Sequence, residues 1–130
     1  MDLALSTTLH TSFDDAIERT RAALAEQGFG ILTDIDMRAT MKAKLGHDME
    51  DYRILGACHP PLAHRAVETN RQIGLLLPCN VVVRADPTQP GTVLVEAMNP
   101  QLMVQVTDQP ALNPIADEAT TRLRAALAAL

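Results

Sequence analysis

Aromatic side chains are almost absent from this 130-residue sequence, which has no tryptophan and only Phe13, Phe29 and Tyr52 as rings. The core must therefore be built from aliphatic side chains and methionine, which pack by volume. Proteins that bind single-stranded nucleic acid stack bases on aromatic rings, and a net charge of −5 provides no basic surface for a polyanion. We therefore expect a protein that does not bind nucleic acid.

Long hydrophobic runs are also missing. The longest, residues 73–78, is far too short to cross a bilayer, and the first ten residues lack the charged flank and apolar block of a secretory signal peptide. We therefore expect a cytoplasmic protein that does not associate with membranes and whose two cysteines stay reduced. The chain of 14.1 kDa is long enough to enclose one core, which predicts a single domain over residues 1–130.

The pattern of apolar residues predicts a mixture of helices and strands. Residues 3–9, 29–36 and 52–58 alternate between apolar and polar, as half-buried strands do, and the β-rich runs 80–85 and 92–97 are joined by turn formers, which predicts an antiparallel hairpin. Apolar residues at helical spacing predict helices after Ser12, over 37–45, from Pro60 to Ile73, and from Asn113 to the end. Residues 99–109 fit either a short strand or a helical turn.

Capping residues mark the expected helix boundaries. Ser12 begins an S-x-x-D pattern and caps the first helix, which Gly28 ends because glycine enters the left-handed conformation freely. Asn113 is the expected cap of the last helix, with Pro114 in its first position. The resulting order is β-α-β-(short α)-β-α-β-β-α, which predicts an α+β fold: a single, mainly antiparallel sheet with helices packed on one face.

Both cysteines lie at corners braced by proline. Cys58 ends a strand just before the helix that starts at Pro60, and Cys79 follows Pro78 at the start of the next strand. Free backbone N–H groups and the positive end of the helix dipole would lower the pKa of a thiol at such a helix start. If the two strands are neighbours in the sheet, the two sulfurs could approach each other.

Three interpretations of these cysteines remain open. The simplest is that both are buried fillers, because free cysteine is among the most buried residue types. The second is thiol chemistry, with Cys58 as the attacking sulfur and Cys79 as the resolving one. The third is a metal site made by the two cysteines with His59 or His64, although the spacing C-H-x4-H-x14-C lacks the paired C-x-x-C of zinc sites. No nucleotide, hydrolase or zinc-protease motif occurs, so we expect no cofactor and leave open whether the protein is an enzyme.

The sequence resembles the domain of unknown function 302 family over nearly its whole length. The matching blocks are Ile35-Asp36, Lys44-Leu45-Gly46, Gly56-Ala57-Cys58-His59-Pro60 with Ala63, Leu76-Leu77-Pro78-Cys79-Asn80-Val81, and Asn99-Pro100. Position 59 is histidine here, where the family more often has asparagine. The resemblance implies a small α+β domain of the TATA-box-binding-protein-like fold class that is often dimeric, and it implies no activity. Within these blocks, Asp36, His59 and Asn80 are candidate binding residues.

These observations lead to two functional hypotheses. The first is a homodimer that binds a small apolar ligand or a protein partner, because a sheet with helices on one side leaves a face or a groove and the hydrophobic fraction is 47%. The alternative is a thiol-based redox or metal-binding protein that uses Cys58 and Cys79.

Overall fold

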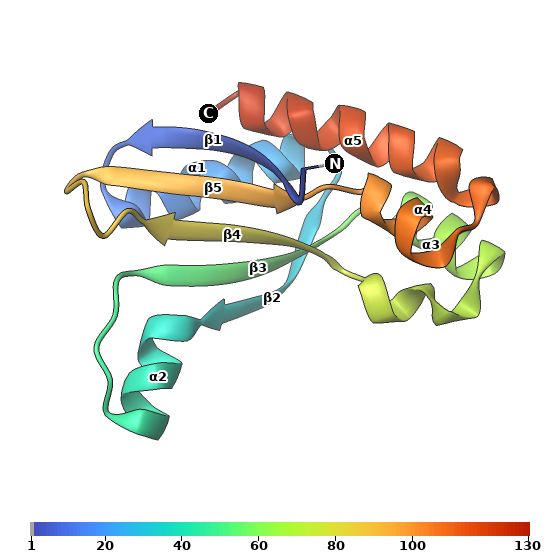
Figure 1. Cartoon of the computed structure of the whole chain (residues 1–130). Coiled ribbons are helices and arrows are strands. Elements are labelled where there is room, and N and C mark those ends of the chain that lie inside the picture. Colours follow the sequence, from blue (N-terminus) through green and yellow to red (C-terminus); the bar gives the residue numbers. More distant parts are fainter. Residues whose placement is uncertain (1) are drawn as a thin grey trace.

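The fold comes from a computed structural model, in which residues 2–130 are described. Its centre is one five-stranded antiparallel sheet with the strand order β1-β5-β4-β3-β2 (Figure 1). The strands are β1 (Ala4–His10), β2 (Gly30–Asp36), β3 (Tyr52–Cys58), β4 (Cys79–Ala85) and β5 (Thr92–Met98). The helices are α1 (Phe13–Glu26), α2 (Met37–Leu45), α3 (Pro60–Thr69), α4 (Gln101–Thr107) and α5 (Asn113–Ala128), with 3-10 helices η1 (Arg71–Leu76) and η2 (Pro110–Leu112). The predicted α+β class and element order are confirmed.

One face of the sheet is covered by α1 and α5 and forms the larger part of the core. Side chains alternate between the two faces of a strand, so Leu55, Val81 and Val95 all point to the covered face, where they are completely buried. Ile17 of α1 and Leu123 of α5 pack against them. Aliphatic residues fill this layer, as expected from the scarcity of rings.

A second, smaller cluster of buried residues lies beyond the end of the sheet, where α3, η1 and α4 meet the first half of α5 (Figure 1). Leu62, Ile73 and Met103 are at its centre. Helix α5 is long enough to serve both clusters, with Ile115 in the second and Leu123 in the first. Residues of both clusters face one hollow, and we call this boundary between the clusters the seam.

The local signals at the first helix are confirmed. The Ser12 side chain accepts a hydrogen bond from the Asp15 backbone N–H at 3.2 Å. Gly28 follows the helix with φ +86°, the left-handed conformation that favours glycine. Residues 99–109, which fitted two structures, contain helix α4. None of the helices formed by residues 2–130 is both long and apolar enough to span a membrane.

Two predicted helix boundaries are wrong. Helix α3 ends at Thr69 because the Asn70 side chain accepts a hydrogen bond from the Gln72 backbone N–H, which starts η1, so Ile73 belongs to η1. Asn113 does not cap α5: its backbone is already helical at φ −54° and ψ −49°, because the chain enters α5 directly from η2.

Helix α2 differs from the other helices because it projects away from the body of the protein (Figure 1). The helix predicted over 37–45 is present, with an apolar stripe of Met37, Met41 and Leu45, but none of its residues is buried. The prediction that helices pack on one face therefore describes α1 and α5, and α2 extends from the sheet near its β2 edge.

Candidate functional site

A cavity of about 310 Å³ lies in the seam between the two buried clusters; we call it the seam cavity. Its lining is almost entirely apolar, and no charged side chain takes part, apart from any charge on His59. Exposed Leu32 and Gly74 stand at its rim. The lining residues are Phe29, Leu32, Ala57, Cys58, His59, Leu62, Ala63, Ala66, Gly74, Leu77, Pro78, Cys79, Met103, Ile115 and Ala119.

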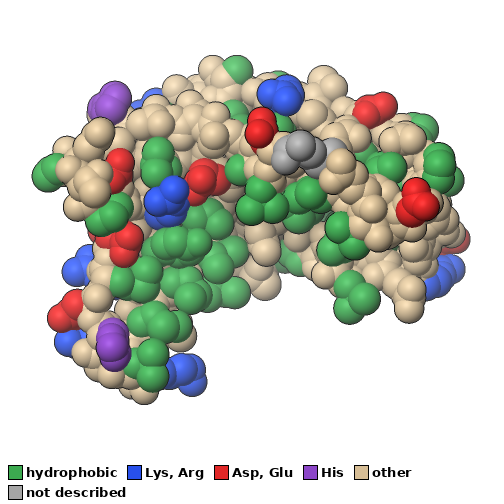
Figure 2. All heavy atoms as spheres, viewed as in Figure 1, with side chains coloured by type: hydrophobic (Ala, Val, Ile, Leu, Met, Phe, Trp, Pro, Cys, Tyr) green, Lys and Arg blue, Asp and Glu red, His purple; other side chains and the backbone are tan. Residues whose placement is uncertain are grey.

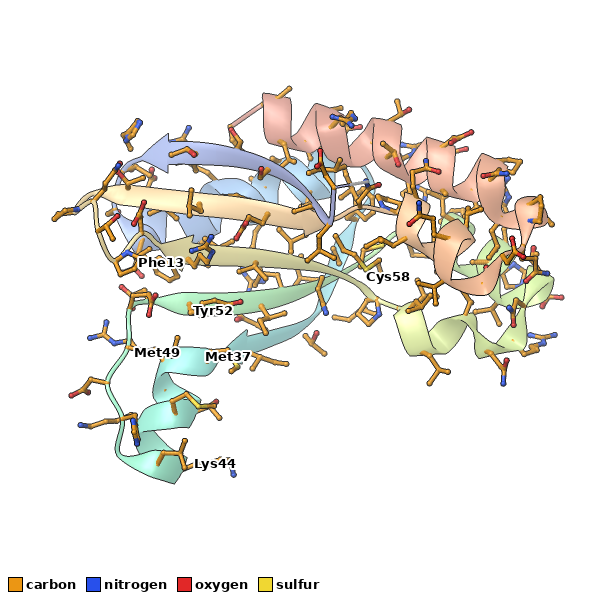
Figure 3. The ribbon with its side chains drawn as sticks, viewed as in Figure 1. Phe13, Met37, Lys44, Met49, Tyr52 and Cys58 are labelled. Atoms are coloured by element: carbon orange, nitrogen blue, oxygen red, sulfur yellow. The ribbon has the colours of Figure 1, made fainter. Side chains whose placement is uncertain are left out.

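The strand pairing brings the two cysteines to this cavity. Strands β3 and β4 are neighbours, which was the condition set for bringing the two cysteines close, and Ala57 lies opposite Cys79 in their register. Cys58 follows Ala57, so the two cysteines are offset by one position on adjacent strands, where successive side chains alternate between the faces of the sheet, and both residues line the cavity at the strand ends. Figure 3 shows Cys58 at the end of β3 that faces the helices of the second cluster. Both are free thiols.

The Cys79 thiol is protonated at neutral pH. Burial raises its pKa to about 11, and the neighbouring Cys58 adds to the shift. Only 7% of Cys79 is exposed, so water cannot stabilise a thiolate there. Because the thiolate is the reactive form, Cys79 is a poor nucleophile in the folded protein. Cys58 is half-buried and more accessible.

His59 provides the one ring N–H group in the lining. Its Nδ1 accepts a long hydrogen bond of 3.4 Å from the Leu62 backbone N–H, which caps α3. The proton of the neutral imidazole is therefore on Nε2. Burial, with a contribution from Arg122, lowers the pKa of His59, which favours this neutral form. The ring also packs edge-on against Phe29, with centroids 5.5 Å apart.

Two glycines permit the close approaches around the cavity. A Cβ on Gly28 would lie 3.0 Å from Nε2 of His59, so the ring rests on the backbone that ends α1. A Cβ on Gly56 would overlap the Thr33 hydroxyl and lie 2.8 Å from Cγ of Pro78. Glycine at position 56 therefore lets the proline before Cys79 pack onto β3.

The structure places the other candidate residues away from the seam cavity. Asn80 is exposed on the opposite side of the strand from buried Val81. Asp36 lies at the far end of β2, opposite Arg53 in the pairing register, and its side chain caps α2 by accepting from the Ala39 backbone N–H. Of the candidate binding residues, only His59 lines the cavity.

Of the metal ligands considered from the sequence, Cys58, His59 and Cys79 line the seam cavity, whereas His64 does not. His64 is on the solvent side of α3, where its Nε2 lies 3.6 Å from a carboxylate oxygen of Glu68. Within residues 2–130, no group of three or more histidine, cysteine or acidic side chains is arranged to hold a metal ion.

Sequence reasoning missed several lining residues. Leu32 reaches the rim because a β-bulge between Ile31 and Thr33 inserts it as an extra residue in β2. Met103 and Ile115 come from helices whose packing partners are distant in sequence. A glycine in a strand was the one local signal, since Gly56 marks a point where another segment approaches closely.

The sheet and the seam cavity define a small α+β domain with an apolar cavity at the end of a single antiparallel sheet. The family model described as "Domain of unknown function DUF302" matches residues 5–130, so the chain belongs to this family. A crystal structure of an uncharacterized conserved DUF302 protein from Bacillus stearothermophilus is similar, with 29% sequence identity and a TM-score of 0.89 over 99% of this chain and 98% of that chain. No curated protein matches the sequence.

Proposed function

We propose that this protein is a homodimer that binds a small, uncharged and mainly apolar ligand in the seam cavity. The main support for ligand binding is the cavity itself, which has a volume of about 310 Å³ and is lined almost wholly by apolar side chains. Ligand sites are typically concave, mainly apolar and provided with a few polar groups. Support for the homodimer comes from the face of the sheet opposite α1 and α5.

The chemistry of the lining selects against charged ligands. An ion that leaves water needs a partner of opposite charge or several hydrogen bonds, and the cavity offers neither an arginine nor a lysine. His59 carries one N–H donor, on Nε2 beside Gly28, and the lowered pKa of His59 favours the neutral ring. The ligand class that fits is therefore an aliphatic or aromatic molecule with one neutral acceptor, such as a carbonyl or ether oxygen.

The neutral dye Nile red, titrated into the purified protein and followed by fluorescence, tests the ligand-binding part. Ala63→Leu adds volume at a half-buried position that lines the cavity, whereas Ala125→Leu makes the same change at an exposed position on α5. We expect Ala63→Leu to weaken dye binding at least about tenfold, because the added atoms occupy the cavity. Ala125→Leu should bind the dye as the wild type does. Equal affinity for both variants, or no binding by the wild type, would overturn the proposal.

A second candidate function is thiol chemistry, favoured by the two cysteines that line one cavity from adjacent strands. In that reaction the Cys58 thiolate attacks one sulfur of oxidised glutathione and displaces a glutathione thiolate. The Cys79 sulfur then attacks the mixed disulfide, loses its proton and releases a second glutathione. The raised pKa of Cys79 slows this second step.

Mass spectrometry of the native protein after incubation with oxidised glutathione separates these outcomes. An internal disulfide, seen as a loss of two hydrogens that Cys79→Ala abolishes, would support thiol chemistry. A stable mixed disulfide on Cys58, or no reaction, would contradict it and leave both cysteines as lining residues only.

A further inference from the structure

The face of the sheet opposite α1 and α5, which we call the open face, carries apolar side chains where an exposed sheet would be polar. The pairing register places Ile35, Ile54 and Val82 side by side across three strands. Leu94 and Tyr52 lie in the next row of the same face. Antiparallel sheets with one solvated face normally alternate apolar and polar residues. An apolar row in the middle of such a face indicates that something covers it.

The open face carries only a small and balanced charge. Arg84 and Glu96 form an ion pair of 2.6 Å across β4 and β5, and each side chain is about one-third exposed (29% and 30%). The pair can be covered without leaving an unpaired charge, which is the costly outcome of burying ions. This matters for self-association, because two chains that each carry a net charge of −5 repel each other, and a neutral contact adds no close pair of like charges to that repulsion.

Helix α2 adds a second apolar surface next to the open face. It has nine residues, none of them buried, and its stripe includes Leu45, whose exposure is 64%. Isolated helices shorter than about 12–15 residues are marginal in water, and its ion pairs, Arg38 with Asp51 and Lys42 with Asp48, are exposed and add little. Figure 2 shows hydrophobic side chains gathered over the sheet and down to the base of this helix, where Figure 3 places Met37, Met49 and Tyr52.

The size of this surface suits a second copy of the chain. Five strands of seven residues at spacings of about 4.8 Å and rises of about 3.4 Å give a face of roughly 570 Å². A nine-residue helix adds roughly 130 Å², since it is about 13.5 Å long and about 10 Å wide. The total is a planar footprint of roughly 700 Å², and because side chains give a face more accessible surface than its footprint, it is large enough for the roughly 800 Å² of accessible surface that each partner buries in a standard stable interface.

We propose that the open face and α2 form a two-fold symmetric interface between two copies of this chain. In such an interface the same patch on both subunits meets itself. Helix α2 extends beyond its own sheet (Figure 1), so α2 of each copy would pack on the partner. Tyrosine and methionine, which are enriched in interfaces, are present at the junction of the sheet and α2. This inference rests on the homodimer of the proposed function and identifies its contact surface.

Sedimentation equilibrium of the wild-type chain and two variants tests the interface. Val82→Lys places a charge in the central row of the open face, at a half-buried position on a middle strand, and Val106→Lys makes the same change on α4, where the side chain is 66% exposed. We expect a wild-type dimer, an increase of at least about a hundredfold in the dissociation constant for Val82→Lys, and no change for Val106→Lys.

The remaining outcomes separate the interface from the homodimer itself. A dimer that Val82→Lys leaves intact would overturn the proposed surface but not the homodimer, whereas a wild-type monomer at all concentrations would overturn both. Should Val82→Lys fail to fold, Leu45→Lys on exposed α2 must raise the dissociation constant at least about tenfold, and an unchanged value would contradict the proposal. Nile red binding by a folded monomeric variant is measured in parallel, so that failure of the ligand site is recognised separately.

Discussion

The two ends of strand β3 are held in opposite ways. At the end that carries Cys58, the surroundings are uncharged and tightly packed. They comprise the apolar seam cavity, the buried Cys79 thiol, and Gly56, where an added Cβ would lie too close to Pro78. At the end that carries Tyr52, they are ionic and partly solvated, because the Asp34 carboxylate pairs with Arg53 and Arg21. We therefore expect the first end to respond to changes of volume and to high pH, and the second to respond to salt and acid.

The largest effect is expected from Gly56→Ala at the cavity end. The new methyl group would overlap the Thr33 side chain and press against Pro78, so the two strand ends must separate. We expect a loss of about 3 kcal/mol in the free energy of unfolding, measured by urea denaturation. Gly74→Ala is the matched control, because it lies at the cavity rim with no atom within 4 Å of the added Cβ. A loss below about 1 kcal/mol for Gly56→Ala, or equal losses for both variants, would contradict this description of the cavity end.

A smaller effect is expected when the Cys79 thiol ionises. Its pKa is about 11 in the folded protein and about 9.0 as a free group, so the thiol favours the folded state fully below pH 9. This contribution is lost as the pH rises from about 9 to about 11, up to roughly 2–3 kcal/mol, because ionisation is easier in the unfolded chain. Urea denaturation over this range should show a shallower decline for Cys79→Ala than for Cys58→Ala. If the stability of the two variants declined equally with pH, the pKa of Cys79 would not be raised by burial.

Sequence patterns predicted the parts of the fold that depend on neighbouring residues. Ser12 caps the start of α1 and Gly28 follows its end, so each acts within one helical turn of its neighbours. The β4–β5 hairpin is joined by a short loop of turn-forming residues. The pairing of β3 with β4 was expected only conditionally, yet it explains why both cysteines line one cavity. These features could be predicted because their causes are local or involve consecutive strands.

The seam cavity could not be predicted because its walls come from segments that are distant in sequence. Met103 belongs to residues 99–109, which fitted two structures until tertiary packing selected a helix. Leu32 reaches the cavity through a bulge that the alternating pattern of β2 does not reveal. Asn70 ends α3 by a side-chain hydrogen bond that competes with the helix. Asp36 belongs to a family block and yet caps α2 at the far end of the sheet.

The smallest effect is expected from Asp34→Asn at the ionic end of β3. The hydrogen bond from Arg53 is the main reason why the pKa of Asp34 lies below its ordinary value, and Arg21 adds to the shift. Stability from this carboxylate is therefore present above its unfolded pKa of about 3.8 and is lost as the pH falls through the lower, folded value. At neutral pH we expect Asp34→Asn to cost about 0.5–1 kcal/mol, because the ion pairs are partly solvated.

High salt should narrow the difference between Asp34→Asn and the wild type, since salt screens exposed charges. Asp48→Asn is the control: Asp48 pairs with Lys42 at 3.1 Å, but its side chain is 80% exposed, so its loss should cost almost nothing. A cost for Asp34→Asn that persists unchanged in 1 M salt would mean that the Arg53–Asp34 contact acts through packing, as at the cavity end. The two ends of β3 would then not differ in the way that their charges indicate.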